Sequence, residues 1–197
     1  MKKRVLIISN YYPPEIGAAS NRIKNLAEGL VLANMEVTVI CPLPNYPKGI
    51  VFPKYKGKFN ASEERNGVFI KRYWLYPSKS KNSFIRLFSM LSFAVTIWSA
   101  VFSLIRKKPN LCIVNSPPLL VGLSGLLLSK FIRCSSILNV SDLWPLSALE
   151  LGILKKGKFY NLLNKIELLN YKLATNIIGQ SSEINKHIIN LVKKEPL

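Results

Sequence analysis

The sequence has few acidic and few metal-binding side chains. Among its 197 residues, 10 Asp and Glu stand against 28 Lys and Arg, and there are one histidine and three cysteines. No cluster of His, Cys and carboxylates has the spacing of a metal site, and no Ser/His/Asp set for nucleophilic catalysis can be assembled. We therefore expect neither a metal ion nor a cofactor.

The cysteines are scattered, odd in number and set in apolar surroundings. Cys41, Cys112 and Cys134 thus lack both the pairing of a disulfide framework and the spacing of a zinc site. The apolar run at residues 5–9 is too short for the core of a signal peptide. Both observations indicate a protein of the reducing cytoplasm.

The shortage of acidic residues gives the chain a formal charge of +18. A field of this sign attracts the phosphates of nucleotides, nucleic acids or anionic lipids. No nucleic-acid-binding motif accompanies the charge, which instead gathers around an apolar segment, since residues 42–110 carry 13 Lys and Arg against two Glu. We expect an anionic membrane surface as a partner and no nucleic acid.

Short apolar strands alternate with helical segments along the whole chain, without an internal repeat. The predicted strands are residues 5–9, 37–41, 68–74, 111–114, 136–140 and 176–179. The predicted helices are a segment capped by Ser20, residues 84–105, 119–131 and 158–173, and a last one from Ser182. Such βαβ units close into a parallel sheet covered by helices. We therefore expect the α/β class, with one doubly wound, Rossmann-like domain over residues 1–197 and a long irregular excursion at residues 42–66.

Candidate sites are the loops after the strands, because ligands of open α/β sheets bind at the carboxyl ends of the strands. The first such loop carries Glu15 and Gly17. Gly17 would let the backbone approach a ligand, and the helix start offers N–H groups to an anion. The alternative is a plain turn glycine, which the local sequence favours. The dinucleotide fingerprint G-x-G-x-x-G is absent from this loop, which argues against a nicotinamide dehydrogenase.

The second loop follows residues 136–140 and contains Asp142, the single aspartate of the chain, and Trp144. A carboxylate at a strand end can orient a hydroxyl, accept a proton or stabilise developing positive charge. Asp142 could equally be a helix N-cap ahead of Pro145. The local sequence favours neither the catalytic carboxylate nor the helix N-cap.

The third loop, residues 180–183, opens the last helix. Ser181 or Ser182 can cap that helix, and Glu183 is favourable beside its dipole, so a structural role is the stronger interpretation. His187 lies one turn further along. It is expected to be a surface or partly packed residue rather than a catalyst.

Residues 87–105 form a run of 19 residues without a charge, flanked by Arg86 and by a basic triplet at residues 106–108. The length suits a membrane-spanning helix. Several Ser and Thr, and a position where the alternation requires a helix, favour packing on the sheet or embedding in one leaflet over spanning. The surrounding charge suits an anionic bilayer surface, the alternative being a solvated basic face.

Several motifs occur in a fixed order along the chain. They are Tyr11-Tyr-Pro-Pro-Glu-Ile-Gly-Ala-Ala-Ser20, Val37-Thr-Val, Pro44-Asn-Tyr-Pro-Lys-Gly49, Ser116-Pro-Pro-Leu119 and Asp142-Leu-Trp-Pro145. Together they resemble the N-terminal domain of family 4 glycosyltransferases, most closely the branch that builds O-antigen and capsular polysaccharides. The likeness departs at Leu146, where relatives tend to carry an acidic residue.

The resemblance implies the N-terminal, acceptor-side half of a retaining, metal-independent GT-B glycosyltransferase. The donor would be a UDP-sugar held mainly by a C-terminal domain that lies outside these 197 residues, so that a separate chain could supply it. The acceptor would be a polyprenyl-diphosphate-linked saccharide at the inner face of the plasma membrane, in lipopolysaccharide or capsule synthesis. Asp142 would be catalytic, and the expected substrate-binding residues are Glu15, Gly17, Ser20, Trp144, Ser182 and Glu183. The alternative is a truncated, non-catalytic acceptor-binding or scaffold domain at the membrane.

Overall fold

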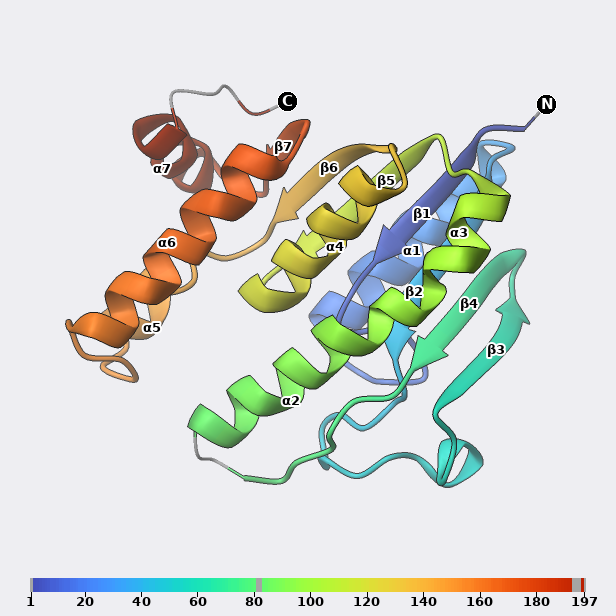
Figure 1. The fold of residues 1–197 in the computed structure, drawn as a ribbon, viewed down its shortest axis with the longest axis horizontal. Helices are drawn as coiled ribbons and strands as arrows, with labels where there is room; N and C mark the ends of the chain where they lie inside the picture. The colour runs from blue at the N-terminus through green and yellow to red at the C-terminus, as the bar shows by residue number, and fades with distance from the viewer. Residues whose placement is uncertain (1, 81–82, 193–195, 197) are drawn as a thin grey trace.

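The computed structural model describes residues 2–80, 83–192 and 196. A seven-stranded sheet in the order β3-β4-β2-β1-β5-β6-β7 forms the centre, with helices on both faces (Figure 1). Neighbouring strands run parallel except β3 and β4, which are antiparallel. The expected doubly wound α/β class is confirmed.

The elements follow the predicted alternation closely. The strands are β1 Arg4–Ile8, β2 Glu36–Pro42, β3 Asn60–Arg65, β4 Val68–Tyr73, β5 Leu111–Ser116, β6 Ser135–Val140 and β7 Asn176–Gly179. The α-helices are α1 Ala18–Leu32, α2 Ser83–Thr96, α3 Val101–Lys107, α4 Leu119–Phe131, α5 Leu146–Glu150, α6 Lys158–Leu173 and α7 Ser182–Val192, and the 3₁₀ turns are η1 Pro53–Tyr55 and η2 Ile97–Ala100.

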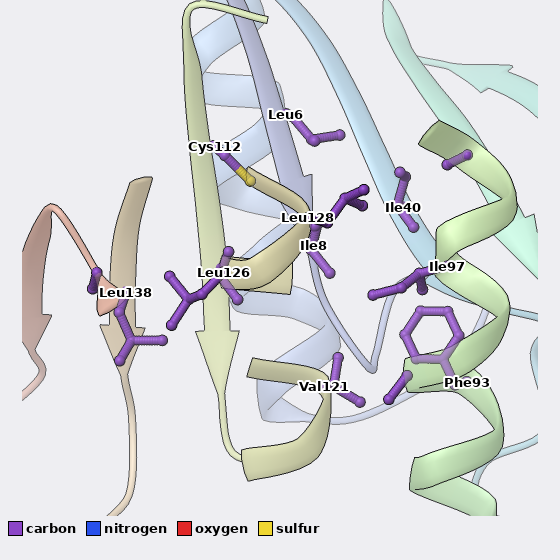
Figure 2. Close-up of a cluster of buried hydrophobic side chains, with 14 of the residues drawn as sticks. Leu6, Ile8, Ile40, Phe93, Ile97, Cys112, Val121, Leu126, Leu128 and Leu138 are labelled. Atoms are coloured by element: carbon purple, nitrogen blue, oxygen red, sulfur yellow. The ribbon is translucent and has the colours of Figure 1, made fainter. Parts of the chain in front are cut away.

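The central strands are buried on both faces, which is why they read as continuous apolar runs. Along β1, Val5 and Ile7 belong to the core under α1, whereas Leu6 and Ile8 belong to the core under α2 and α4. Figure 2 shows the second of these cores, in which Phe93 of α2 points toward the side chains of the sheet and of α4. The alternation of strand side chains therefore anchors one helical layer on each face.

Helix α4 packs closely against the sheet because the residue at the contact, Gly125, has no side chain. A Cβ atom built on Gly125 would lie 2.9 Å from Val114 Cγ1 and 3.3 Å from Ile8 Cδ1. A side chain here would push the helix away from β1 and β5. The close contact sets the distance between the middle of α4 and the two strands.

The prediction of an irregular segment at residues 42–66 is wrong for its second half, which contains η1 and the antiparallel edge strand β3. β3 pairs with β4 from Arg65 opposite Val68, so Asn66 and Gly67 form a two-residue turn, with φ of 51° and 74°. An Asn-Gly pair is the typical sequence of such a hairpin turn. β3 was not predicted because its residues are mostly polar, which is typical of an exposed edge strand.

Two helix boundaries also differ from expectation. α1 begins at Ala18, with Gly17 as the N-cap residue and no side-chain cap, so Ser20 lies inside the first turn rather than at the cap. The predicted helix at residues 84–105 is present as α2, η2 and α3 in succession. Its 3₁₀ turn follows Thr96, whose hydroxyl donates to the carbonyl oxygens of Trp74 and Phe93 and so competes with regular helix bonding.

Candidate functional site

The carboxyl edge of the sheet contains a topological switch point. From β1 the chain passes through α1 to β2 on one side, while β5 pairs with β1 on the other. The loops after β1 and β5 therefore diverge and leave a crevice, which is where open α/β sheets bind ligands. Two adjacent pockets lie here, and Tyr11 lines both.

The first, the glycine-loop pocket, has a volume of about 210 Å³ and is lined by the loop from β1 into α1 and by Tyr46. Tyr11 and Tyr46 stand edge to face at its side, with ring centroids 5.5 Å apart. A Cβ on Gly17 would have a single neighbour, Tyr46 Cε1 at 3.8 Å. Gly17 thus leaves the pocket open rather than relieving a clash within the protein.

The first turn of α1 faces this pocket. Ala18, Ala19 and Ser20 line it, no side chain caps the helix start, and the turn contains no acidic residue. The first N–H groups of a helix lack partners within the helix, and the helix dipole adds positive charge. The pocket is therefore suited to a small anion such as a phosphate group.

Glu15 holds the loop together from inside the protein. The residue is 3% exposed, and its Oε1 accepts hydrogen bonds from the backbone N–H groups of Asn45 and Tyr46 at 2.8 and 2.9 Å. Burial raises the pKa of this carboxyl group, against the effect of these hydrogen bonds. Ser20, 2% exposed, donates through Oγ to the Glu15 carbonyl oxygen at 2.7 Å. Both side chains are thus engaged in fixing the loop.

Behind the loop stands a buried arginine that sequence reasoning missed. Arg72 is 1% exposed and donates to Glu63 Oε1 at 2.7 Å and to the Pro13 carbonyl oxygen. Tyr55 also donates to Glu63, at 2.8 Å, and its ring lies 5.3 Å from the guanidinium carbon of Arg72. The only signal in the sequence was a basic residue at an inward position of an apolar strand.

The second pocket, the apolar pocket, has a volume of about 250 Å³. Its walls come from α2, the start of α4, the loop after β6, α5, the middle of the connection between α5 and α6, and the first turns of α6. Leu87, Met90, Leu120, Trp144, Ile153 and Phe159 are among the lining residues. Of the residues predicted to bind substrate, Trp144 is the one that the structure brings here.

Asp142 is exposed on the loop after β6 and accepts a hydrogen bond from Ser147 Oγ at 3.2 Å on Oδ2. Helix α5 begins at Leu146 with Pro145 as the N-cap residue and no side-chain cap, so the structure gives no support to Asp142 as an N-cap. Asp142 does not line either of the two pockets described. Its carboxylate faces solvent two residues before Trp144.

Side-chain amides tie the strand ends together on this edge. Asn115 of β5 donates to the Ile8 carbonyl oxygen at 3.2 Å, and Asn139 of β6 donates to Asn115 Oδ1 at 2.8 Å. Gln180 extends this hydrogen-bond network. Its Nε2 donates to Asn139 Oδ1 at 3.5 Å, and its Oε1 accepts from Arg22 of α1 at 2.6 Å. Sequence reasoning missed these residues, although an amide near the end of a buried apolar strand was a visible signal.

The third predicted loop has a capping role. Ser181 Oγ accepts from the N–H of Ile184 at 3.2 Å, so Ser181 rather than Ser182 caps α7. Ser182 is exposed at the first position of α7, and Glu183, also exposed, pairs with Lys186 at 3.0 Å. Neither of them lines the two pockets.

His187 is partly packed, as expected, with Nε2 3.3 Å from Glu167 Oε1. Burial raises the pKa of Glu167, whose Oε1 also accepts from the Tyr171 hydroxyl at 2.8 Å. In the described residues no group of three or more His, Cys, Asp or Glu side chains is placed to hold a metal ion. The cysteines are free thiols, with Cys41 and Cys112 buried.

One helical segment, Leu87–Lys107, is long and apolar enough to cross a membrane, with 28% of its apolar window buried. Its outward side chains include Phe88, Val95 and Phe102, which are 54%, 62% and 79% exposed. Its inward side chains, among them Phe93 and Ile97, pack on the sheet. A helix of this kind is a core element on one side and an apolar surface on the other.

Comparison with known proteins agrees with the geometry. A family described as a glycosyl transferase 4-like domain matches residues 17–195. A protein of Escherichia coli strain K12 named as a colanic acid biosynthesis glycosyl transferase, WcaI, is 28% identical over 155 residues, which cover 79% of this chain and 38% of that protein. The match thus spans well under half of the length of this relative.

Two solved structures share the fold. A UDP-N-acetylglucosamine 2-epimerase from Listeria monocytogenes superposes with a TM-score of 0.56 and 10% identity, over 98% of this chain and 43% of its own. UGT2 of Phytolacca americana, complexed with UDP-2fluoro-glucose and pterostilbene, gives a TM-score of 0.57 and 13% identity, over 99% of this chain and 52% of its own. At such identities the likeness concerns the fold alone.

Proposed function

The chain belongs to the glycosyl transferase 4-like family, and from this premise we propose that it is the acceptor-side half of a retaining GT-B glycosyltransferase. The donor is a nucleotide sugar, a UDP-sugar, and the acceptor is a polyprenyl-diphosphate-linked saccharide. The reaction extends a cell-surface polysaccharide at the inner face of the plasma membrane. Neither a metal ion nor a cofactor takes part. The name of the Escherichia coli relative supports the polysaccharide class.

The observation that carries this proposal is the adjacency of two unlike pockets at the carboxyl edge. The glycine-loop pocket presents backbone N–H groups, and the apolar pocket presents hydrophobic side chains. Because Tyr11 lines both pockets, ligands seated in the two would meet beside this residue. A glycosyl transfer between a phosphate-bearing donor and a lipid-linked acceptor requires such a meeting of two ligands.

On the donor side, the proposed ligand group is a phosphate or the transferred sugar, approaching Gly17 and the first turn of α1. Glu15 and Ser20 act as positioning residues, because their side chains are buried in contacts that hold the loop. Ser182 and Glu183 remain proposed substrate contacts from the third loop, exposed at the start of α7. Helix N-termini stabilise anions through their N–H groups and dipole.

Asp142 is the proposed catalytic residue. Its carboxylate is exposed and engaged by one hydroxyl, that of Ser147, so it is free to accept a proton from, or to orient, an acceptor hydroxyl. Trp144, two residues on, lines the apolar pocket and would place the acceptor beside it. The carboxylate could also stabilise positive charge that develops on the transferred sugar.

The proposed partner surface is an anionic membrane, reached through the outer side of Leu87–Lys107. Exposed aromatic and aliphatic residues lie along this segment, and Arg106, Lys107 and Lys108 at its end are exposed. Each basic residue near an anionic bilayer adds about 1 kcal/mol of attraction. Because the inner side of the segment packs on the sheet, peripheral or monotopic binding is favoured over spanning.

The test is sedimentation of the purified chain with anionic liposomes, with and without a polyprenyl-diphosphate sugar, across a salt series. The expected result is binding that the glycolipid strengthens and that weakens as the salt concentration rises. Liposomes of the same charge without the glycolipid serve as the control. Equal sedimentation with and without the glycolipid at every salt concentration would contradict the proposed acceptor.

The second candidate is an acceptor-binding or scaffold domain without catalytic activity, and the apolar pocket together with the exposed apolar side of Leu87–Lys107 favours it, since both could bind a lipid-linked saccharide without transfer. A labelled UDP-sugar incubated with the chain and membrane extract distinguishes the two. We expect no transfer until a donor-binding half is supplied. Transfer by the 197 residues alone would eliminate the purely binding role.

A further inference from the structure

The apolar pocket has a charged rim that the proposed function does not yet use. Leu154 and Phe159 both line the pocket, and the four residues between them include Lys155, Lys156 and Lys158, all exposed. Each lysine lies at most two residues from a wall residue, so its Cα is within about 8 Å of that residue's Cα. A lysine side chain extends far enough from there to reach the mouth of the pocket.

These lysines have no ionic partner among the residues that the structure describes. In the described residues no salt bridge involves any of them, and Glu150, the nearest carboxylate along this connection, forms none either. The first turn of α6, which begins at Lys158, contains no acidic residue and has no side-chain cap at Gly157. Its N–H groups therefore add to the positive character of the rim.

We propose that the apolar pocket and this lysine rim together bind the diphosphate end of an isoprenoid lipid, with the first isoprene units in the pocket and the diphosphate on Lys155, Lys156 and Lys158. This inference rests on the proposed acceptor and assigns its anchoring group to named residues. Hydrophobic walls hold a hydrocarbon chain, and lysines bind phosphate as point charges.

The size of the pocket sets how much of the lipid it holds. At about 250 Å³, it is below the 300 to 1,000 Å³ that is typical of sites for whole small molecules. The units nearest the diphosphate fit inside, and a longer chain continues outside. Ile85, Phe88 and Leu91 of α2 are exposed beside the wall residues Leu87 and Met90, and they offer an apolar path toward a bilayer.

The test is equilibrium dialysis of the chain with radiolabelled farnesyl diphosphate, below the concentration at which it forms micelles. The variant combines Lys155→Ala, Lys156→Ala and Lys158→Ala. Its matched control combines Lys3→Ala, Lys130→Ala and Lys172→Ala, which removes the same charge from exposed positions outside the pocket. Circular dichroism confirms that both variants are folded.

The expected result is binding about tenfold weaker in the rim variant than in the control variant, since each of the three exposed ion pairs contributes modestly. Binding of radiolabelled farnesol should be the same in both. A second variant, Met90→Gln with Ile153→Asn, should weaken farnesol and farnesyl diphosphate alike, because both substitutions lie in the pocket wall. Equal affinity of the rim and control variants for farnesyl diphosphate would overturn the assignment.

The outcomes also separate this inference from the proposed function. If the rim variant keeps its affinity while the chain still prefers liposomes with the polyprenyl-diphosphate sugar, the lysine assignment is wrong and the acceptor stands. If the wild-type chain binds neither farnesyl diphosphate nor the glycolipid, both fail. If unlabelled inorganic diphosphate displaces the ligand as well as farnesyl diphosphate does, the rim is an anion site without a lipid pocket, and the inference is overturned.

Discussion

The two pockets that meet at Tyr11 are built in different ways. The glycine-loop pocket is lined by the loop from β1 into α1 and by the rings of Tyr11 and Tyr46, and its loop is fixed by the hydrogen bonds of Glu15 and by the ion pair of Arg72 and Glu63. The apolar pocket consists of hydrophobic side chains that come from separate segments, with Ile153 64% exposed. A fixed polar frame suits a group of defined geometry such as a phosphate. Adaptable apolar walls suit a chain of repeating hydrocarbon units.

The largest expected effect comes from removing the frame of the first pocket. Arg72→Leu deletes the buried partner of Glu63 and leaves the Pro13 carbonyl oxygen without its donor. Glu63 is partly exposed and keeps Lys54 and Tyr55, so the cost comes from the lost charged hydrogen bond and the unsatisfied carbonyl oxygen, together about 3 kcal/mol of unfolding free energy. Urea denaturation measures this cost, with Lys54→Ala as the control, since Lys54 binds the same carboxylate from a fully exposed position and should matter little.

The same variant sharpens the comparison of the pockets. Under conditions where Arg72→Leu is still folded, its affinity for farnesyl diphosphate should equal that of the wild type, because the arginine does not line the apolar pocket. A parallel loss of lipid affinity in the folded variant would show that the two pockets share one frame.

The next effect concerns chemistry rather than structure. Asp142→Asn in a glycosyltransferase completed with its donor-binding half should lower turnover about a hundredfold, the usual scale of a lost proton acceptor. The unfolding free energy should change little, because the side chain is exposed and has one partner, Ser147. Unchanged turnover, measured with saturating donor and acceptor, would remove Asp142 from the catalytic role.

A smaller effect separates the donor side from the acceptor side. Ala18 is exposed in the first turn of α1 and lines the glycine-loop pocket. In the glycosyltransferase completed with its donor-binding half, Ala18→Glu places a carboxylate where a donor phosphate is proposed and should raise the donor KM about tenfold, corresponding to roughly 1.4 kcal/mol. Ala18→Gln, of the same size without the charge, should raise it much less. Equal effects would show that bulk rather than charge matters there.

The smallest effect is on acid stability. Burial opposes ionisation of Glu63, but hydrogen bonds from Lys54, Arg72 and Tyr55 outweigh it and lower its pKa to about 2. Because the folded-state pKa is depressed, this stabilisation is present above the ordinary pKa of glutamate and is lost as the pH falls from about 4.5 toward 2. Urea midpoints across that range should fall less in Glu63→Gln than in the wild type, while farnesol binding by the two should be alike.

The sequence predicted the sheet and most helices because their signals are local. α4 and α6 begin and end where the apolar periodicity does, and the parallel strands are short apolar runs. β3 was missed because its polar residues depend on β4 for their conformation, although Asn66 and Gly67 marked the turn.

The candidate site was less predictable, since it depends on where side chains point. Glu15 and Ser20 lie in the predicted loop, but the Glu15 carboxylate is held by the backbone N–H groups of Asn45 and Tyr46, which are distant in the sequence, and Ser20 bonds to the Glu15 carbonyl oxygen. The apolar pocket combines residues from α2, α4 and the connection before α6. No local pattern shows that Met90 and Phe159 share one cavity.

The most direct test of the division between the two pockets is photo-crosslinking with a polyprenyl diphosphate that carries a photoreactive group on its first isoprene unit. Peptide mapping by mass spectrometry locates the label. The account predicts labelling of residues 87–90, 119–120 and 153–159, with a reduced yield in the variant that lacks the three rim lysines. Labelling concentrated in the loop from Tyr11 to Ser20, or equal yields in the rim and control variants, would contradict it.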